Sequence, residues 1–221
     1  MIKFREGLRP PVPLDEVEDM YWDARPDYRV VEGEHTEGPF NRSAAINAAA
    51  KLAGNWDVAV IAGADTCVPY AQLDEAVRLA RRTGKLVSAL SSVVELGQDC
   101  TETLLSGRPL LPWQLSAERA RTDEITVQPS MTVVARMLWE RIGLFDLAFQ
   151  GWGGEDNAFW KAATILGGMP VRVDGAAFHL WHPTTDIVTR KMDPLYRQNL
   201  ERWRRYEQVT CECGLRRVRA S

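Results

Sequence analysis

The hexapeptide GWGGED, at positions 151–156, combines the residue types that are best suited to chemistry in this sequence. Its glycines let the backbone take positive φ angles and pass close to a ligand, and Trp152 offers a flat apolar face. Glu155 and Asp156 follow at the predicted start of a helix, where acidic residues also occur because they compensate the helix dipole. Dipole compensation explains neither the tryptophan nor the glycines, so the segment indicates a functional site.

Asp65, His179 and His182 are candidate metal ligands. Asp65 follows a continuous apolar run that predicts a buried strand, and ligands of open α/β sheets collect beyond the carboxyl ends of such strands. The two histidines stand where another predicted strand stops before Pro183. If the chain turns after Leu180, both rings could face one ion, and this donor set suits Mn²⁺ or a similar divalent metal. The alternatives are a turn aspartate bonded to its own backbone and two half-buried, hydrogen-bonded histidines, which a regular strand would point to opposite faces.

Two pairs of an aromatic residue and an arginine stand in the first part of the chain. Phe4 and Arg5 follow a first predicted strand, and Phe40 and Arg42 flank the start of an alanine-rich segment. The aromatic rings could stack on a base, and the guanidinium groups could neutralise phosphate. A core phenylalanine beside a surface arginine is the common alternative for each pair.

The scaffold that must position these residues is predicted to alternate strands and helices, which favours an α/β domain. Residues 96–123, which contain several glycines and prolines, are predicted to form an irregular surface excursion. The predicted helices cover about residues 14–24, 41–54, 71–84, 136–143, 155–168 and a stretch from 194 onward. The predicted strands cover about residues 1–4, 28–33, 56–66, 85–94, 125–135, 170–174 and 176–182.

Length and composition limit what the chain can be. Its 221 residues fit one compact domain, and its net charge of −3 excludes the global field that drives indiscriminate nucleic-acid or membrane binding. The first residues lack the features of a secretory signal, and no apolar run approaches the ~20 residues of a membrane span, so we expect a cytoplasmic protein. The cysteines at positions 67, 100, 211 and 213 are too scattered for a disulfide framework, and we expect reduced thiols.

Five motifs follow one another in a recognisable order: KFRE, FNRSAAIN, AGAD, GWGGED and HLWH. Their succession, over residues 3–182, resembles the β-1,4-galactosyltransferase family and related GT-A transferases, including the galactosaminyl transferases of chondroitin-type polymerases. The resemblance implies a single GT-A, Rossmann-like domain with a central mixed, mostly parallel sheet flanked by helices. It also implies a nucleotide-binding half at 1–95, an acceptor and catalytic half at 96–185, and a C-terminal helix and tail at 186–221.

The resemblance assigns a role to each candidate residue. Asp65 matches the last acid of the family's Asp-x-Asp motif, and His179 and His182 match its later metal ligands. Asp156 matches the catalytic base, and Glu155 matches the acid that binds the acceptor sugar. Phe4, Arg5, Phe40, Arg42 and Asp65 are implied to bind the nucleotide, and Trp152, Gly153, Gly154 and Glu155 to contact donor and acceptor.

The implied function is a metal-dependent, inverting transfer of a sugar from a nucleotide-sugar, with a UDP-sugar as first choice, to an acceptor hydroxyl. Mn²⁺ is the first choice of metal and Mg²⁺ the second; the acceptor could be a saccharide, a protein, a lipid-linked intermediate or a modified nucleic-acid base. The alternatives are a catalytically silent nucleotide- or carbohydrate-binding module and a metal-dependent nucleotidyltransferase or hydrolase on the same fold. Three features depart from the family pattern: Gly63 replaces the first acid of Asp-x-Asp, Asn157 replaces a further acid, and the first strand is short.

Overall fold

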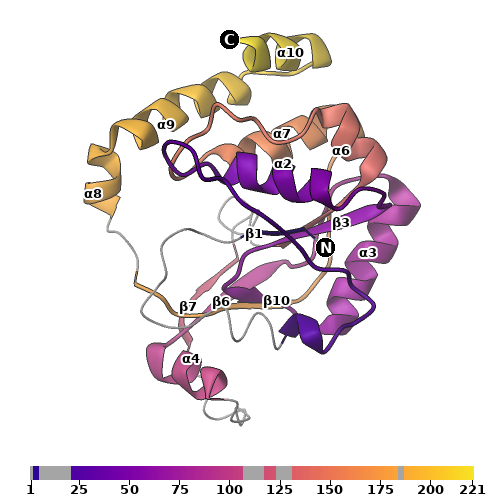
Figure 1. Cartoon of the computed structure of the whole chain (residues 1–221), viewed down its shortest axis with the longest axis vertical. Helices are drawn as coiled ribbons and strands as arrows, with labels where there is room; N and C mark the ends of the chain where they lie inside the picture. The colour runs from indigo at the N-terminus through magenta and orange to yellow at the C-terminus, as the bar shows by residue number, and fades with distance from the viewer. Residues whose placement is uncertain (1, 5–20, 107–116, 123–130, 184–186) are drawn as a thin grey trace.

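The structure of the chain is a computed structural model that describes residues 2–4, 21–106, 117–122, 131–183 and 187–221 (Figure 1). Its described helices are α2 (Arg42–Leu52), α3 (Tyr70–Thr83), α4 (Gln98–Leu105), α6 (Arg136–Ile142), α7 (Glu155–Gly167), α8 (Ile187–Met192), α9 (Pro194–Glu207) and α10 (Glu212–Ala220). Its described strands are β1 (Ile2–Phe4), β2 (Val31–Gly33), β3 (Val58–Ala62), β4 (Thr66–Cys67), β5 (Val87–Ser88), β6 (Ser92–Leu96), β7 (Ala117–Arg121), β8 (Met131–Ala135), β9 (Val171–Arg172) and β10 (Ala176–His179).

The strands form two mixed sheets with helices packed against them, so the predicted α/β class with a mixed sheet is confirmed. The six-stranded sheet has the order β2-β1-β3-β8-β5-β9, and the four-stranded sheet has the order β4-β10-β6-β7. Parallel pairs are β1–β2, β1–β3, β5–β9 and β6–β10, whereas β3–β8, β5–β8, β4–β10 and β6–β7 are antiparallel. The resemblance implies one central sheet, and the structure contains a second, four-stranded sheet in addition.

Strand β3 is apolar throughout because both of its faces are buried. Ala59 and Ile61 belong to a core cluster with residues of α2, α6 and α7, whereas Val60 and Ala62 belong to a second cluster with residues of α3. Alternate side chains of a strand point to opposite faces, so a strand between two helical layers requires a continuous apolar run. Figure 1 shows these layers, with α9 and α10 stacked beyond α7.

Local sequence signals explain where several helices begin and end. Asn41 accepts a hydrogen bond from the Ala44 N–H at 2.9 Å and so caps the start of α2. Gly84 takes a left-handed conformation at the end of α3, where a residue with a Cβ would be strained. The Asp193 side chain caps α9, and Pro194 occupies its first turn. The predicted helices at 41–54, 71–84, 136–143, 155–168 and from 194 are therefore confirmed within two residues at their ends.

The segment from 85 to 123 differs from its prediction in two ways. Residues 85–94 form two strands in different sheets, because the chain bends where the Ser91 N–H donates to the Gly175 carbonyl at 2.9 Å. The excursion predicted at 96–123 contains α4 and β7, although residues 107–116 and 123 lie outside the described part. Helix α4 buries Cys100 and Thr101, and β7 pairs with β6, so tertiary contacts supply the order that the local sequence does not suggest.

Some predicted elements extend beyond the part of the chain that the structure describes. Residues 5–20 lie outside it, so the helix predicted near 14–24 is described only from residue 21. Residues 123–130 also lie outside, which leaves β8 as the described part of the strand predicted at 125–135.

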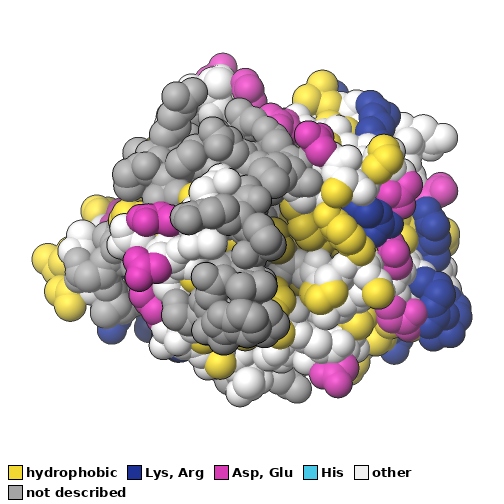
Figure 2. Space-filling view, turned by 90° about the horizontal axis from the view of Figure 1, so that it is seen from below, with side chains coloured by type: hydrophobic (Ala, Val, Ile, Leu, Met, Phe, Trp, Pro, Cys, Tyr) yellow, Lys and Arg dark blue, Asp and Glu magenta, His cyan; other side chains and the backbone are white. Residues whose placement is uncertain are grey.

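The molecular surface carries both signs of charge. On the face shown in Figure 2, acidic and basic side chains are interspersed, as expected for a net charge of −3. None of the helices within the described ranges has both the length and the apolar character that crossing a membrane requires.

Candidate functional site

The turn after β3 and the end of β10 lie side by side because two short strands join them. Thr66 directly follows Asp65 and pairs with His179 in the antiparallel β4–β10 ladder. The Leu180 N–H donates to the Asp65 carbonyl at 2.8 Å, which extends this contact past the end of the strand. The sheet register therefore places Asp65 next to the histidine segment.

Asp65, His179 and His182 form a compact cluster. The Nε2 atoms of His179 and His182 lie 3.3 and 3.2 Å from Asp65 Oδ2, and the potential ligand atoms all lie within 4.8 Å of one another. Strand β10 ends at His179, and the irregular backbone that follows lets both rings face the carboxylate, with 5.3 Å between their centroids. Burial alone would raise the pKa of Asp65, but hydrogen bonds from the two histidines hold this pKa well below its ordinary value.

The donor set of this cluster fits a divalent metal ion. One carboxylate oxygen and two imidazole nitrogens are ligands that Mn²⁺ and similar ions accept. About a quarter of each side chain is exposed, which leaves room for further ligands from a substrate. The regular strand ends at His179, and both rings approach Asp65 Oδ2, so they do not point to opposite faces of a strand.

Gly63 leaves space for the side chain of Asp65. A Cβ built on Gly63 would lie 2.9 Å from Asp65 Oδ1, which is closer than real Cβ contacts allow. The same oxygen accepts a hydrogen bond from the Thr66 hydroxyl at 3.0 Å, so it is held in this position. Aspartate at position 63 would therefore displace the Asp65 side chain from its present orientation.

Glu155 and Asp156 form a second cluster with Arg42. The guanidinium of Arg42, at the start of α2, donates to Glu155 Oε1 at 3.1 Å and to Asp156 Oδ1 at the start of α7. The side chains of Arg42, Glu155 and Asp156 are 14%, 11% and 21% exposed, so the ion pairs are largely shielded from water. Burial would lower the pKa of Arg42, but the two carboxylates raise it above its ordinary value. Arg42 therefore contacts the acidic pair, and its assignment to the nucleotide stays a prediction.

Burial is the largest cause of a raised pKa at Glu155, which reaches about 7 against an ordinary 4.5. The negative charge of Asp156 adds to this rise, and Arg42 opposes it. Glu155 thus changes its charge near neutral pH, beside a carboxylate that the resemblance assigns to catalysis.

The raised pKa of Glu155 predicts a pH dependence of stability. The folded chain binds this proton more tightly than the unfolded chain, so the stabilisation is fully present below about pH 4.5 and is lost as the pH rises through about 7. Between these values we expect the melting temperature of the unaltered chain to fall by about 5 °C relative to that of Glu155→Gln. Thermal denaturation across this range measures the difference, and a difference that stays constant with pH contradicts the expectation.

The loop before α7, which carries the GWGGED motif, is hydrogen-bonded to the segment that carries the FNR motif. The Gly151 N–H donates to the Phe40 carbonyl at 2.6 Å, and the Asn41 side chain donates to the Leu147 carbonyl at 2.8 Å. The segments FNR and GWGGED, far apart in the sequence, are therefore in direct contact. The Phe40 side chain is partly buried against the core, and Trp152 is 50% exposed.

The N-terminal candidates are described only in part. Phe4 ends β1, with its backbone paired to Gly33 of β2, and Arg5 lies outside the described residues. Their assignment to the nucleotide therefore stays a prediction.

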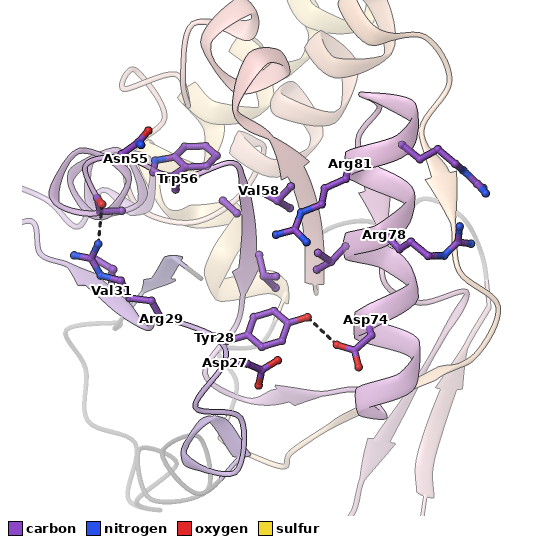
Figure 3. Close-up of a pocket in the computed structure, with 15 residues that line it drawn as sticks. Asp27, Tyr28, Arg29, Val31, Asn55, Trp56, Val58, Asp74, Arg78 and Arg81 are labelled. Atoms are coloured by element: carbon purple, nitrogen blue, oxygen red, sulfur yellow. Dashed lines mark hydrogen bonds between the residues drawn. The ribbon is translucent and has the colours of Figure 1, made fainter.

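A cavity of about 700 Å³ is lined by the first residues of β3 (Figure 3), whereas Asp65 follows the other end of this strand. Val58, the first residue of β3, belongs to its wall together with residues of α3. The carboxylate of Asp74 in this wall accepts hydrogen bonds from the Tyr28 hydroxyl at 3.0 Å and from Arg25 at 2.7 Å. This cavity is thus distinct from the metal-ligand cluster, and both acidic residues in its wall, Asp27 and Asp74, are paired with Arg25.

Neither a family model nor a curated protein matches this chain. A solved structure that resembles it is that of a Drosophila β-1,4-galactosyltransferase 7 mutant in complex with manganese, UDP-Gal and xylobiose. The two share 15% sequence identity with a TM-score of 0.46, and the match covers 78% of this chain and 64% of the other. The chain thus spans less than two thirds of that structure's length, and we base the proposed function on the residues of this chain.

Two buried polar residues support the site and were not predicted from the sequence. Asn199 in α9 binds the backbone of Gln150 and Trp152, and Thr101 in α4 accepts a hydrogen bond from the Trp181 N–H at 2.8 Å. Asn199 lies three residues after Tyr196 and four before Trp203, so the spacing places it on the same face of the predicted helix as these two aromatic residues. A polar residue on such a face is a signal that could have identified it, since buried polar groups require hydrogen-bond partners.

Proposed function

We propose that this chain is a metal-dependent glycosyltransferase of the GT-A type that moves a sugar from a nucleotide-sugar to an acceptor hydroxyl. A UDP-sugar is the first choice of donor, and a saccharide is the first choice of acceptor. The observation that carries the proposal is the convergence of Asp65, His179 and His182 from two distant segments into one set of ligand atoms. This cluster lies beyond the carboxyl end of a central strand, where ligands of open α/β sheets bind.

In this proposal Asp65, His179 and His182 hold a divalent ion, with Mn²⁺ as first choice. When bound there, such an ion supplies positive charge that makes a diphosphate an acceptable leaving group. We assign residues 1–95 to the donor side of the site and residues 96–185 to its acceptor side. Residues 186–221 are assigned to the C-terminal helices that support the acceptor side. Phe4, Arg5, Phe40 and Arg42 are proposed to border the nucleotide.

Asp156 is the proposed catalytic base, and Glu155 the group that binds the acceptor. The contacts of Arg42 hold both carboxylates in fixed positions at the start of α7, and Asp156 is the more exposed of the two. The acceptor hydroxyl gives its proton to a carboxylate oxygen of Asp156 as its oxygen attacks the anomeric carbon. The bond from that carbon to the phosphate oxygen breaks, and the nucleoside diphosphate leaves from the opposite face.

A single displacement of this kind predicts inversion at the anomeric carbon. We expect an α-linked donor such as UDP-galactose to yield a β-linked product, because attack and departure take place on opposite faces of the sugar. The anomeric proton coupling in the NMR spectrum of the product measures the configuration. Retention would rule out direct displacement assisted by Asp156.

Acceptor dependence separates a transferase from a hydrolase or a silent binding module. UDP release from UDP-galactose, UDP-glucose and UDP-N-acetylgalactosamine would be followed with Mn²⁺, with and without a panel of saccharides that includes xylobiose. A transferase releases UDP faster when its acceptor is present. Release at the same rate without any acceptor indicates a hydrolase, and binding without turnover across the panel indicates a silent module.

A further inference from the structure

The backbone of the glycine-rich loop is bound by one buried side chain of α9. Asn199 is 3% exposed, and its Oδ1 accepts a hydrogen bond from the Gln150 N–H at 3.2 Å. Its Nδ2 donates to the carbonyls of Gln150 at 2.7 Å and of Trp152 at 3.1 Å. The asparagine amide therefore fixes the backbone on both sides of Gly151.

The glycines of the loop serve its backbone conformation, and Gly154 also leaves space for Phe149. A Cβ built on Gly151 would lie 3.4 Å from the Leu195 side chain, and one on Gly153 would lie 3.5 Å from the Tyr196 ring. A Cβ on Gly154 would lie 2.8 Å from Phe149. All three glycines have positive φ angles, between 69° and 96°. The three glycines therefore serve the turn as well as any ligand, and Gly154 also serves its packing.

The Trp152 side chain also contacts the C-terminal helices. The guanidinium carbon of Arg190 in α8 lies 4.3 Å from the centroid of the Trp152 ring, and the Tyr196 ring of α9 lies 5.6 Å away. These contacts restrain the ring while half of its surface stays exposed. Both the backbone and the aromatic side chain of the loop thus depend on α8 and α9.

We propose that Asn199 is a positioning residue that sets the orientation of Glu155 and Asp156 through the loop that leads into α7. The inference rests on the proposed function, since it concerns the acceptor side of the same site. Glycine has more backbone freedom than any other residue, so a loop with three glycines needs an external restraint to hold one conformation. The side chain of Asn199 supplies that restraint from a rigid helix.

Removing the amide is expected to loosen the loop without disturbing the metal-ligand cluster. In Asn199→Ala the loop loses three hydrogen bonds, and the fraction of molecules with Asp156 in its productive position falls. Because small displacements of reacting groups can lower rates about 100-fold, we expect kcat to fall by about 10- to 100-fold. Binding of UDP with Mn²⁺ should stay within about twofold, since Asp65, His179 and His182 keep their contacts.

Asn47 provides a matched control. Its side chain in α2 donates to the Phe145 carbonyl at 3.0 Å and accepts from the Phe145 N–H at 3.0 Å, so it also binds the backbone of a distant segment. Asn47→Ala removes comparable hydrogen bonds without touching residues 150–152. Asn199→Asp is a second variant of nearly native shape, in which a carboxylate faces the two carbonyls that the amide now binds.

The experiment combines amide hydrogen exchange with kinetics. In both Asn199 variants we expect exchange in residues 150–156 to rise at least about tenfold, together with the fall in kcat. In Asn47→Ala, exchange in this segment and kcat should match the unaltered chain. Unchanged exchange or unchanged kcat in both Asn199 variants overturns the inference, as does an equal loss of kcat in Asn47→Ala. If the unaltered chain transfers no sugar, the proposed function fails instead, and the exchange data alone decide whether Asn199 restrains the loop.

Discussion

Asp156→Asn is expected to lower the rate of sugar transfer by about 1,000-fold while metal-dependent binding of UDP stays nearly unchanged. Asparagine has almost the same shape as aspartate, but it cannot take the proton of the acceptor hydroxyl. Arg42 keeps Glu155 as a partner, so the start of α7 keeps one of its two ion pairs. Single-turnover kinetics with UDP-galactose and calorimetric titration with UDP and Mn²⁺ measure the two quantities separately.

Asp99 offers a control at an equivalent helix position. It is the second residue of α4, as Asp156 is the second residue of α7, and it is exposed. Asp99→Asn therefore removes a similar interaction with a helix dipole but no proposed catalytic group. Loss of UDP binding in Asp156→Asn would show that this residue acts on the donor rather than on the acceptor.

Asp65→Ala is expected to remove the thermal stabilisation that Mn²⁺ and a UDP-sugar together give to the unaltered chain. At about 100 times the dissociation constant, a ligand stabilises the folded state by about 2.7 kcal/mol. For a chain of this size that corresponds to a rise of about 5–10 °C in melting temperature. The variant should show almost none of this rise, because the carboxylate that both histidines contact is absent.

Histidine variants show whether the stabilisation depends on the whole cluster. His182→Ala should weaken the response to Mn²⁺ at least about tenfold in concentration, whereas His35→Ala should leave it unchanged. His35 is the remaining histidine of the chain and does not belong to the cluster. An Asp65→Ala variant that keeps the full response to Mn²⁺ and UDP-sugar would be incompatible with the proposed metal site.

The sequence by itself determined the local elements of this fold. The apolar run of β3, the cap at Asn41 and the left-handed glycine at Gly84 depend on neighbouring residues, so pattern and propensity predict them. The α/β class follows from the order of these elements. The start of α7 directly after a glycine-rich turn also follows from local sequence, because positive φ angles favour glycine. The residues of both candidate clusters could therefore be named before their geometry was known.

Only the tertiary structure decided which of these residues meet. The register between β4 and β10 brings His179 to Asp65, and the packing of α2 against the loop before α7 brings Arg42 to Glu155 and Asp156. The packing of α9 against the same loop places the Asn199 side chain where it binds the backbone of Gln150 and Trp152. Sequence periodicity reports which face of an element is buried, but it carries no information on the register or distance between segments far apart in the chain. Those depend on how the complete set of side chains packs, which the folded structure alone provides.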